Sequence, residues 1–194
     1  MKKITFVHIP KSAGASINSW AKTNHIDNFV SIGHKSINEY KTIYPDWTYD
    51  TSVAIPRNTY TRMLSLYNFA RHKTLKNLRQ AKQGKRIVNK KRLLESLSAW
   101  DKGITYYLDY ILEYSFSHHN QLKYIENVDL LIPYENLKND FSKIQKLTDC
   151  QEPLIQKIHS YKDKSLTTMS VDYINCIKKH FKEELEYFNY KAEI

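Results

Sequence analysis

The chain has 194 residues, which fits one domain with a core of its own. Hydrophobic residues make up 41% and charged residues 26%, as is ordinary for a globular protein, and no stretch approaches the roughly 20 apolar residues that a membrane span needs. The net charge of +10 favours an anionic partner such as a nucleotide, a nucleic acid, an acidic glycan or an anionic membrane.

The N-terminal segment and the cysteines predict where the protein works. Residues 1–10 hold a short apolar run interrupted by His8, without the longer apolar core and small-residue cleavage site of a signal peptide. The two cysteines, Cys150 and Cys176, are too few for a disulfide framework. We therefore expect a cytoplasmic protein with one domain over residues 1–194.

The first sixty residues alternate between strand and helix patterns. Residues 3–9 are apolar on both faces, which is typical of a strand buried in a parallel sheet. A loop and a helix follow, and the alternation continues along the chain. The further elements expected here are strands over 28–32 and 51–55, and helices through Ile17 and Trp20, over 36–44 and from about Asn58. This alternation predicts an α/β fold with a central parallel sheet flanked by helices.

The second half of the chain is less regular. Residues 76–92 are rich in lysine and arginine with few apolar residues, so we expect a solvated helix or a mobile loop there. Pro133 stops a short buried strand over 130–132. The remaining apolar periodicity predicts helices over 104–114, from Leu137 to Leu147, and from Val171 through Phe188.

The segment from Pro10 to Ser16 joins the first strand to the first helix. Such a loop is a general anion site, because the free amides and the dipole of the helix N-terminus favour negative charge. Lys11 adds a cation, and Ser12 and Ser16 add hydroxyl groups. The loop is not a Walker A loop, which needs the pattern Gly-x-x-x-x-Gly-Lys-Ser/Thr. The alternative to an anion site is an ordinary strand-to-helix turn with a surface lysine. Three small residues let a ligand approach the backbone: Ala13, Gly14 and Ala15.

A second basic position follows the third strand. Arg57 stands at the end of that strand, and Asn58 can cap the helix that begins there. Ser65, two turns along, lies on nearly the same helix face as Asn58. Arg57 and Ser65 could therefore hold one phosphate from two sides, with the arginine supplying a forked donor. A capped helix with a surface arginine is the other interpretation.

His34 is the candidate general base. It follows the second strand, and parallel sheets place their sites at the carboxyl ends of strands. Imidazole groups accept protons near neutral pH, although His34 could instead cap or pack at a helix start. His8 is interpreted as structural, and His118–His119 lack cysteine or acidic partners at ligand spacing, so no metal site is expected.

Two motifs resemble those of sulfotransferases that use 3′-phosphoadenosine-5′-phosphosulfate (PAPS). Val7–Ser16 is similar to their 5′-phosphosulfate loop, and most similar to that of the branch with heparan 2-O-sulfotransferases and small bacterial carbohydrate sulfotransferases. At the positions of Ala13 and Ala15 that family tends to have glycine and threonine, respectively. Ile55–Tyr67 resembles their 3′-phosphate motif, Arg-Asn/Asp-Pro-Tyr-x-Arg-x-x-Ser-x-Tyr, with Thr59 in place of proline. Looser resemblance continues over residues 121–141 and 181–190.

The resemblance implies a P-loop-kinase-like sulfotransferase fold and transfer of a sulfuryl group from PAPS to an acceptor hydroxyl, with a carbohydrate favoured. The other product is 3′,5′-ADP, and no metal is needed. By this resemblance Lys11 stabilises the leaving group, and Arg57 and Ser65 bind the 3′-phosphate. His34 is the base. The 5′-phosphate is bound by the loop residues Ser12, Ala13, Gly14, Ala15 and Ser16.

Two other functions stay open. A nucleotide kinase of the P-loop kind shares the parallel-sheet arrangement, and it would bind ATP with Mg²⁺ without regard to a 3′-phosphate. A non-catalytic polyanion- or RNA-binding module would use the basic 76–92 stretch and the many tyrosines, and its binding would depend steeply on salt. A sulfotransferase would bind no specific nucleic acid, and the 76–92 stretch could attract an acidic acceptor glycan.

Overall fold

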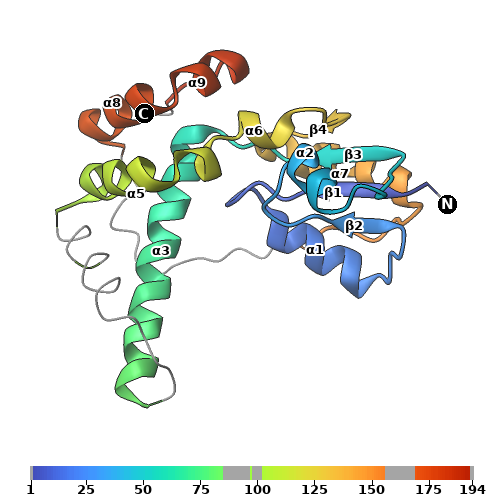
Figure 1. The fold of residues 1–194 in the computed structure, drawn as a ribbon, viewed down its shortest axis with the longest axis horizontal. Helices are drawn as coiled ribbons and strands as arrows, with labels where there is room; N and C mark the ends of the chain where they lie inside the picture. Colours follow the sequence, from blue (N-terminus) through green and yellow to red (C-terminus); the bar gives the residue numbers. More distant parts are fainter. Residues whose placement is uncertain (1, 85–96, 98–101, 156–168, 193–194) are drawn as a thin grey trace. The chain divides into compact units, whose positions relative to one another are not determined.

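The computed structural model describes residues 2–84, 97, 102–155 and 169–192 (Figure 1). The chain divides into two compact units. The first, which we call the sheet unit, comprises Met1–Asn58 and Asn120–His159; the second, the helical unit, comprises Thr59–His119 and Ser160–Ile194. One domain over 1–194 stays a prediction.

The sheet unit contains a four-stranded parallel sheet. The strand order is β2-β1-β3-β4, and every described pairing is parallel (Figure 1). This confirms the predicted α/β class with a central parallel sheet flanked by helices. Each strand lies within the range that the sequence predicts and is shorter than that range. Their bounds are β1 Ile4–Val7, β2 Phe29–Ser31, β3 Thr51–Ala54 and β4 Leu130–Leu131.

One face of the sheet carries most of this unit's apolar core. Ile4 and Phe6 alternate on that face of β1, and both are fully buried. The ring of Trp20 meets Phe141 edge-on at 4.9 Å between ring centroids, so the helices that carry them pack together against the core. The helical elements of this unit are α1 Gly14–Thr23, α2 Ile37–Ile43, α6 Leu122–Ile125, the 3-10 turn η1 Tyr134–Asn136 and α7 Leu137–Thr148.

The strand order creates a point where the direction of the connections reverses. From β1 the chain runs to β2 on one side, whereas from β3 it continues to β4 on the other side. In open parallel sheets the loops diverge at such a point, and ligands bind in the crevice outside the carboxyl ends of the two strands. In this sheet that point is the end of β1 beside the end of β3.

The helical unit has a separate core of aromatic and aliphatic side chains. Its elements are α3 Thr59–Lys82, α5 Ile104–His119, α8 Val171–His180 and α9 Lys182–Phe188. Arg62 is fully buried, where it meets the Glu184 carboxylate at 3.3 Å and donates to the His119 carbonyl at 2.5 Å. The core is formed by Tyr60, Met63, Tyr67, Tyr107, Leu108, Leu112, Tyr173, Cys176, Ile177 and Phe181.

The prediction of one helix from Val171 through Phe188 is wrong. Phe181, with φ −122° and ψ 28°, separates α8 from α9. Ile177 on α8 and Phe181 at the break lie in the same core, with Leu185 of α9 packed against it, so the apolar period runs across the break and hides it.

The basic stretch 76–92 lies only partly within the described residues. Residues 76–82 continue α3, which agrees with the expected solvated helix, and residues 85–92 lie outside the described part. The helix predicted over 104–114 is confirmed and extends to His119, with non-helical angles at Ser115.

Among the described residues, no helix combines the length and the apolar character that crossing a membrane requires.

Candidate functional site

The loop after β1 has the backbone geometry of an anion-binding turn. Lys11 and Ala13 both take left-handed conformations, with φ of 66° and 57°, and Ser12 stands between them. Alternation of left- and right-handed residues is typical of a concave nest of amides for an anion, and here the Ser12 amide donates to the Ile9 carbonyl oxygen at 3.3 Å. Ala13 also precedes α1 directly, and its side chain supplies no cap hydrogen bond to the helix. The loop and the helix N-terminus could therefore hold a phosphate together.

The hydroxyl group of Ser12 is an unusual feature of this loop. Ser12 is 1% exposed, and its Oγ has no hydrogen-bond partner within the described part of the chain. Leaving a buried hydroxyl unpaired costs about 1–3 kcal/mol, so such groups call for an explanation. An anion bound within reach of this hydroxyl would supply its partner.

His8 forms a wall of the loop, whereas the sequence indicated only a structural role in mid-strand. Its ring lies so close to Gly14 that a Cβ atom there would meet His8 Cδ2 at 1.8 Å, so only glycine fits at the start of α1. Burial, with the nearby charges of His34 and Lys11, lowers the pKa of His8 to about 4. His8 is therefore neutral at physiological pH and adds packing without positive charge.

Lys11 and Arg57 come together although 46 residues separate them. Arg57 Nη1 donates to the Lys11 carbonyl oxygen at 3.1 Å. Burial lowers the pKa of the Lys11 ammonium to about 8, with a further contribution from the Arg57 charge. The two cations thus stand at the ends of β1 and β3, where the connections diverge. Two close cations in a partly buried place favour a bound anion.

Two residues from the later part of the chain hold Arg57 in place. Gln121 is fully buried; its Oε1 accepts from the Arg57 amide and its Nε2 donates to the Arg57 carbonyl, both at 2.8 Å. The ring of Tyr134 lies 4.3 Å from the guanidinium carbon, and the Tyr134 amide donates to the Pro56 carbonyl. Sequence reasoning assigned no role to either residue, and its one signal was their place in segments that loosely resemble the family.

The start of α3 agrees with the predicted helix from about Asn58. The helix begins at Thr59, directly after Asn58, and the Asn58 amide donates to Glu135 Oε1 at 2.8 Å. Glu135 is a further site residue that the sequence left without a role. Ser65 lies half-buried on α3 in the helical unit, and its contact with a ligand at Arg57 stays a prediction.

His34 stands beyond the end of β2 with a defined tautomer. Its Nδ1 lies 2.8 Å from the His8 carbonyl oxygen, which can only accept a hydrogen bond, so Nδ1 carries the proton in the neutral ring. Nε2 is then the basic nitrogen. The rings of His8 and His34 are 4.3 Å apart, which agrees with packing at this position. The alternative that His34 caps α2 is wrong, because the side chain of Ser36 does so.

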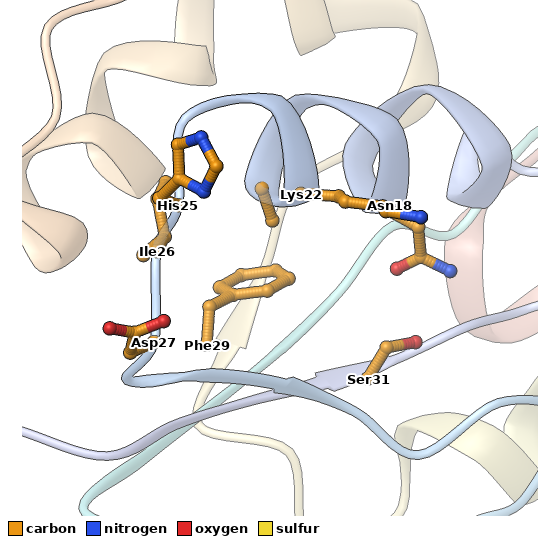
Figure 2. Close-up of a pocket in the computed structure, with 8 residues that line it drawn as sticks. Asn18, Lys22, His25, Ile26, Asp27, Phe29 and Ser31 are labelled. Atoms are coloured by element: carbon orange, nitrogen blue, oxygen red, sulfur yellow. The ribbon is translucent and has the colours of Figure 1, made fainter.

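A separate pocket lies between α1 and β2, with a volume of about 370 Å³. Figure 2 shows the ring of Phe29 between the helix and the strand, with Asn18 and Lys22 above it on α1 and Ser31 beside it on β2. No residue predicted to bind the donor lines this pocket. Of the predicted residues in the sheet unit, the loop after β1 and Arg57 lie at the ends of the central strands β1 and β3, and His34 follows the edge strand β2.

Comparisons with protein-family models, with curated proteins and with solved structures find no match to this chain. The site's own geometry is what the structure contributes to its chemistry. That geometry joins an anion nest, two cations and an oriented imidazole at the carboxyl ends of β1, β3 and β2.

Proposed function

We propose that this protein is a PAPS-dependent sulfotransferase that transfers a sulfuryl group to an acceptor hydroxyl. The observation that carries the proposal is the hydrogen bond from Arg57 to the Lys11 carbonyl. This bond joins the segment that resembles a 5′-phosphosulfate loop to the segment that resembles a 3′-phosphate motif. PAPS carries negative charge at both positions of its ribose, so a site for it needs cations from two directions.

The loop after β1 would bind the 5′ end of the donor. Its left-handed residues and the N-terminus of α1 supply amides for the 5′-phosphate, and the Ser12 hydroxyl can add a hydrogen bond. Lys11 would contact the bridging oxygen, where negative charge grows as the S–O bond breaks. No metal is required in this scheme, since lysine, arginine and amides neutralise the phosphates.

Arg57 would bind the 3′-phosphate. Gln121 fixes its backbone from both sides and Tyr134 supports the guanidinium face, so the fork is oriented before the ligand arrives. The resemblance assigns Ser65 to the same phosphate. Orientation in advance lowers the entropic cost of binding.

Catalysis would follow an in-line displacement. The acceptor oxygen attacks sulfur, the bond from sulfur to the bridging phosphate oxygen breaks, and 3′,5′-ADP leaves with the electron pair. The proton of the acceptor hydroxyl passes to His34 Nε2, the basic nitrogen that its bond to the His8 carbonyl defines. Most of the rate enhancement would come from positioning and from stabilising the charge on the leaving group.

The finer assignments rest on the resemblance. They are a P-loop-kinase-like form of the parallel sheet and a carbohydrate acceptor. A cytoplasmic location is proposed separately, from the two cysteines that form no disulfide framework. The net charge of +10 suits an acidic acceptor glycan.

A thermal-shift comparison of 3′,5′-ADP, ADP and ATP with Mg²⁺ tests the donor class. We expect 3′,5′-ADP to raise Tm well above the shift caused by ADP at the same concentration, because only 3′,5′-ADP engages Arg57. Equal shifts by ADP and 3′,5′-ADP, or a larger one by ATP with Mg²⁺, would favour the nucleotide kinase. No shift by any of them, with steeply salt-dependent RNA binding, would favour the polyanion-binding module.

Three variants test the assigned roles in a PAPS turnover assay. Lys11→Ala should lower kcat about 10²–10³-fold, as loss of one oxyanion donor does.

In the thermal-shift comparison, Arg57→Ala should abolish the preference for 3′,5′-ADP over ADP. His34→Ala should lower kcat, and full activity of this variant between about pH 6 and pH 8 would exclude it as the base. Lys22→Ala, an exposed lysine in the last turn of α1, is the matched control and should behave as the wild type.

A further inference from the structure

Three side chains with metal-binding atoms meet on the helical unit, apart from the site described above. Asp109 comes from α5, and Cys176 and His180 come from α8, four residues apart. Four residues is close to one helical turn, so the cysteine and the histidine share a face of α8. One ligand atom from each of the three lies within 4.8 Å of the other two.

The helix pair that carries this cluster is held firmly by the core. Leu108 of α5 and Ile177 of α8, neighbours in sequence of two of the three residues, are fully buried in the same apolar cluster. The ligating positions are therefore fixed by packing and do not depend on a metal. Cys176 is 8% exposed, His180 is partly buried and the Asp109 side chain is half exposed, so the cluster sits at the rim of the core with access from outside.

We propose that Asp109, Cys176 and His180 form a binding site for a zinc ion. A thiolate, an imidazole and a carboxylate are the ligands that zinc prefers, whereas Mg²⁺ and Ca²⁺ take oxygen ligands. Three protein ligands leave the fourth tetrahedral position for water or another ligand.

The existing distances are close to those that a zinc ion needs. Tetrahedral zinc with ligands at about 2.0–2.3 Å separates its ligand atoms by about 3.5 Å. The ligand atoms of the cluster all lie within 4.8 Å of one another, so the widest pair would close by little more than about 1 Å. His180 Nε2 and Asp109 Oδ1 are hydrogen-bonded at 2.5 Å, so this pair would open as the half-exposed Asp109 side chain turns toward the cysteine. Lys179 Nζ lies 3.4 Å from the same oxygen, but its side chain is mostly exposed and can turn away at little cost.

The sequence alone does not predict this site, because Asp109 is far in sequence from Cys176 and His180. The sequence argument against metal concerned His118–His119 alone, and in the structure His119 is buried with Arg62 bonded to its carbonyl. A metal at the three-residue cluster would tie α5 to α8 and stabilise the helical unit. This proposal does not rest on the proposed sulfotransferase activity.

Cobalt titration of the full chain, without a polyhistidine tag and freed of metal by chelation, tests the site. Co²⁺ bound through Cys176 gives a thiolate charge-transfer absorption in the near ultraviolet that saturates at one ion per chain, and Zn²⁺ abolishes it by displacement. Cys176→Ser should lose this absorption, and Asp109→Ala and His180→Ala should weaken binding at least about tenfold. Cys150→Ser removes the other cysteine, outside the cluster, and should leave the titration unchanged.

Two further readouts keep the outcome decisive. Zn²⁺ should raise the Tm of the wild type and not that of Asp109→Ala, a surface change that leaves the core intact. The proposal is overturned if no thiolate absorption develops, if it persists in Cys176→Ser, or if Asp109→Ala binds like the wild type. Because none of these measurements uses PAPS, failure of the zinc site and failure of the sulfotransferase proposal are separate results.

Discussion

Ala13 adopts a left-handed backbone conformation, with φ 57° and ψ 1°, immediately before α1. The Cβ atom of an L-residue in this region crowds the backbone, whereas glycine takes the same angles without strain. The sulfotransferase loops that this segment resembles tend to have glycine at this position, and a left-handed backbone is a physical reason for glycine. The left-handed turn thus forms here at a cost in stability.

Ala13→Gly should therefore stabilise the protein by about 0.5–1 kcal/mol, the relief of strain less the greater freedom of glycine in the unfolded chain. Urea denaturation measures the change. Ala15→Gly, two residues on but inside α1 and exposed, is the matched control and should destabilise by a similar amount. Destabilisation by both changes would contradict a strained conformation at Ala13.

Lys11 should make donor binding depend on pH. Burial and Arg57 lower the pKa of its ammonium to about 8 in the free protein, so its charge is largely present near neutral pH and is lost as the pH rises. A bound phosphate favours the charged form, so affinity for 3′,5′-ADP should fall about tenfold between about pH 7 and about pH 9. Calorimetric titration at several pH values measures this.

The matched variant for this effect is Lys11→Arg. A guanidinium stays charged throughout this range, so the variant should bind 3′,5′-ADP with little dependence on pH. If Lys11→Arg shows the same decline as the wild type, another group is responsible for it.

Among the structural elements, the turn after β3 depends on support from α6 and η1. The two hydrogen bonds of Gln121 pair both backbone groups of Arg57, and Glu135 pairs the next amide. These contacts hold an irregular segment in one conformation at the point where a strand ends and α3 begins. The orientation of the Arg57 fork is therefore a property of three elements together.

Gln121→Leu should remove this support while keeping a side chain of similar size. We expect a loss of stability of about 2 kcal/mol, because two backbone groups lose their partner, and at least tenfold weaker binding of 3′,5′-ADP. Denaturation and calorimetry measure the two effects. Gln145→Leu on α7 also loses side-chain amide bonds to backbone carbonyls but should keep the affinity. Unchanged affinity in Gln121→Leu would show that Arg57 does not need this clamp.

At the scale of the whole molecule, positive charge is in excess. The chain has 30 lysine and arginine residues against 20 aspartate and glutamate residues. This excess of positive charge raises the concentration of anionic ligands near the protein. The distance over which it attracts them becomes shorter as the Debye length falls from about 10 Å at 0.1 M salt to about 3 Å at 1 M.

Binding of 3′,5′-ADP should therefore weaken roughly tenfold over this range of salt concentration, whereas binding of uncharged adenosine should hardly change. Equilibrium titration with both ligands measures the difference. Equal salt dependence for the two ligands would mean that the charge of the protein does not assist the donor.

Local patterns in the sequence were sufficient for the α/β class and for the loop at Lys11. Strands and helices have their own periods in the apolar residues, and a strand that leads into a helix through small residues is typical of anion sites. Arg57 at the end of β3 and His34 after β2 could be identified in the same way. Each of these inferences needs only residues that are neighbours in the chain.

The assembly of the site required the tertiary structure, because it depends on contacts between residues far apart in sequence. The order β2-β1-β3-β4 brings Arg57 to Lys11, and the packing of later segments brings Gln121 and Tyr134 to Arg57. The break between α8 and α9 at Phe181 also became visible only in the tertiary structure, because both helices contribute to one core. No local period records which distant segment a residue will meet, since that choice is made by the burial of the whole chain.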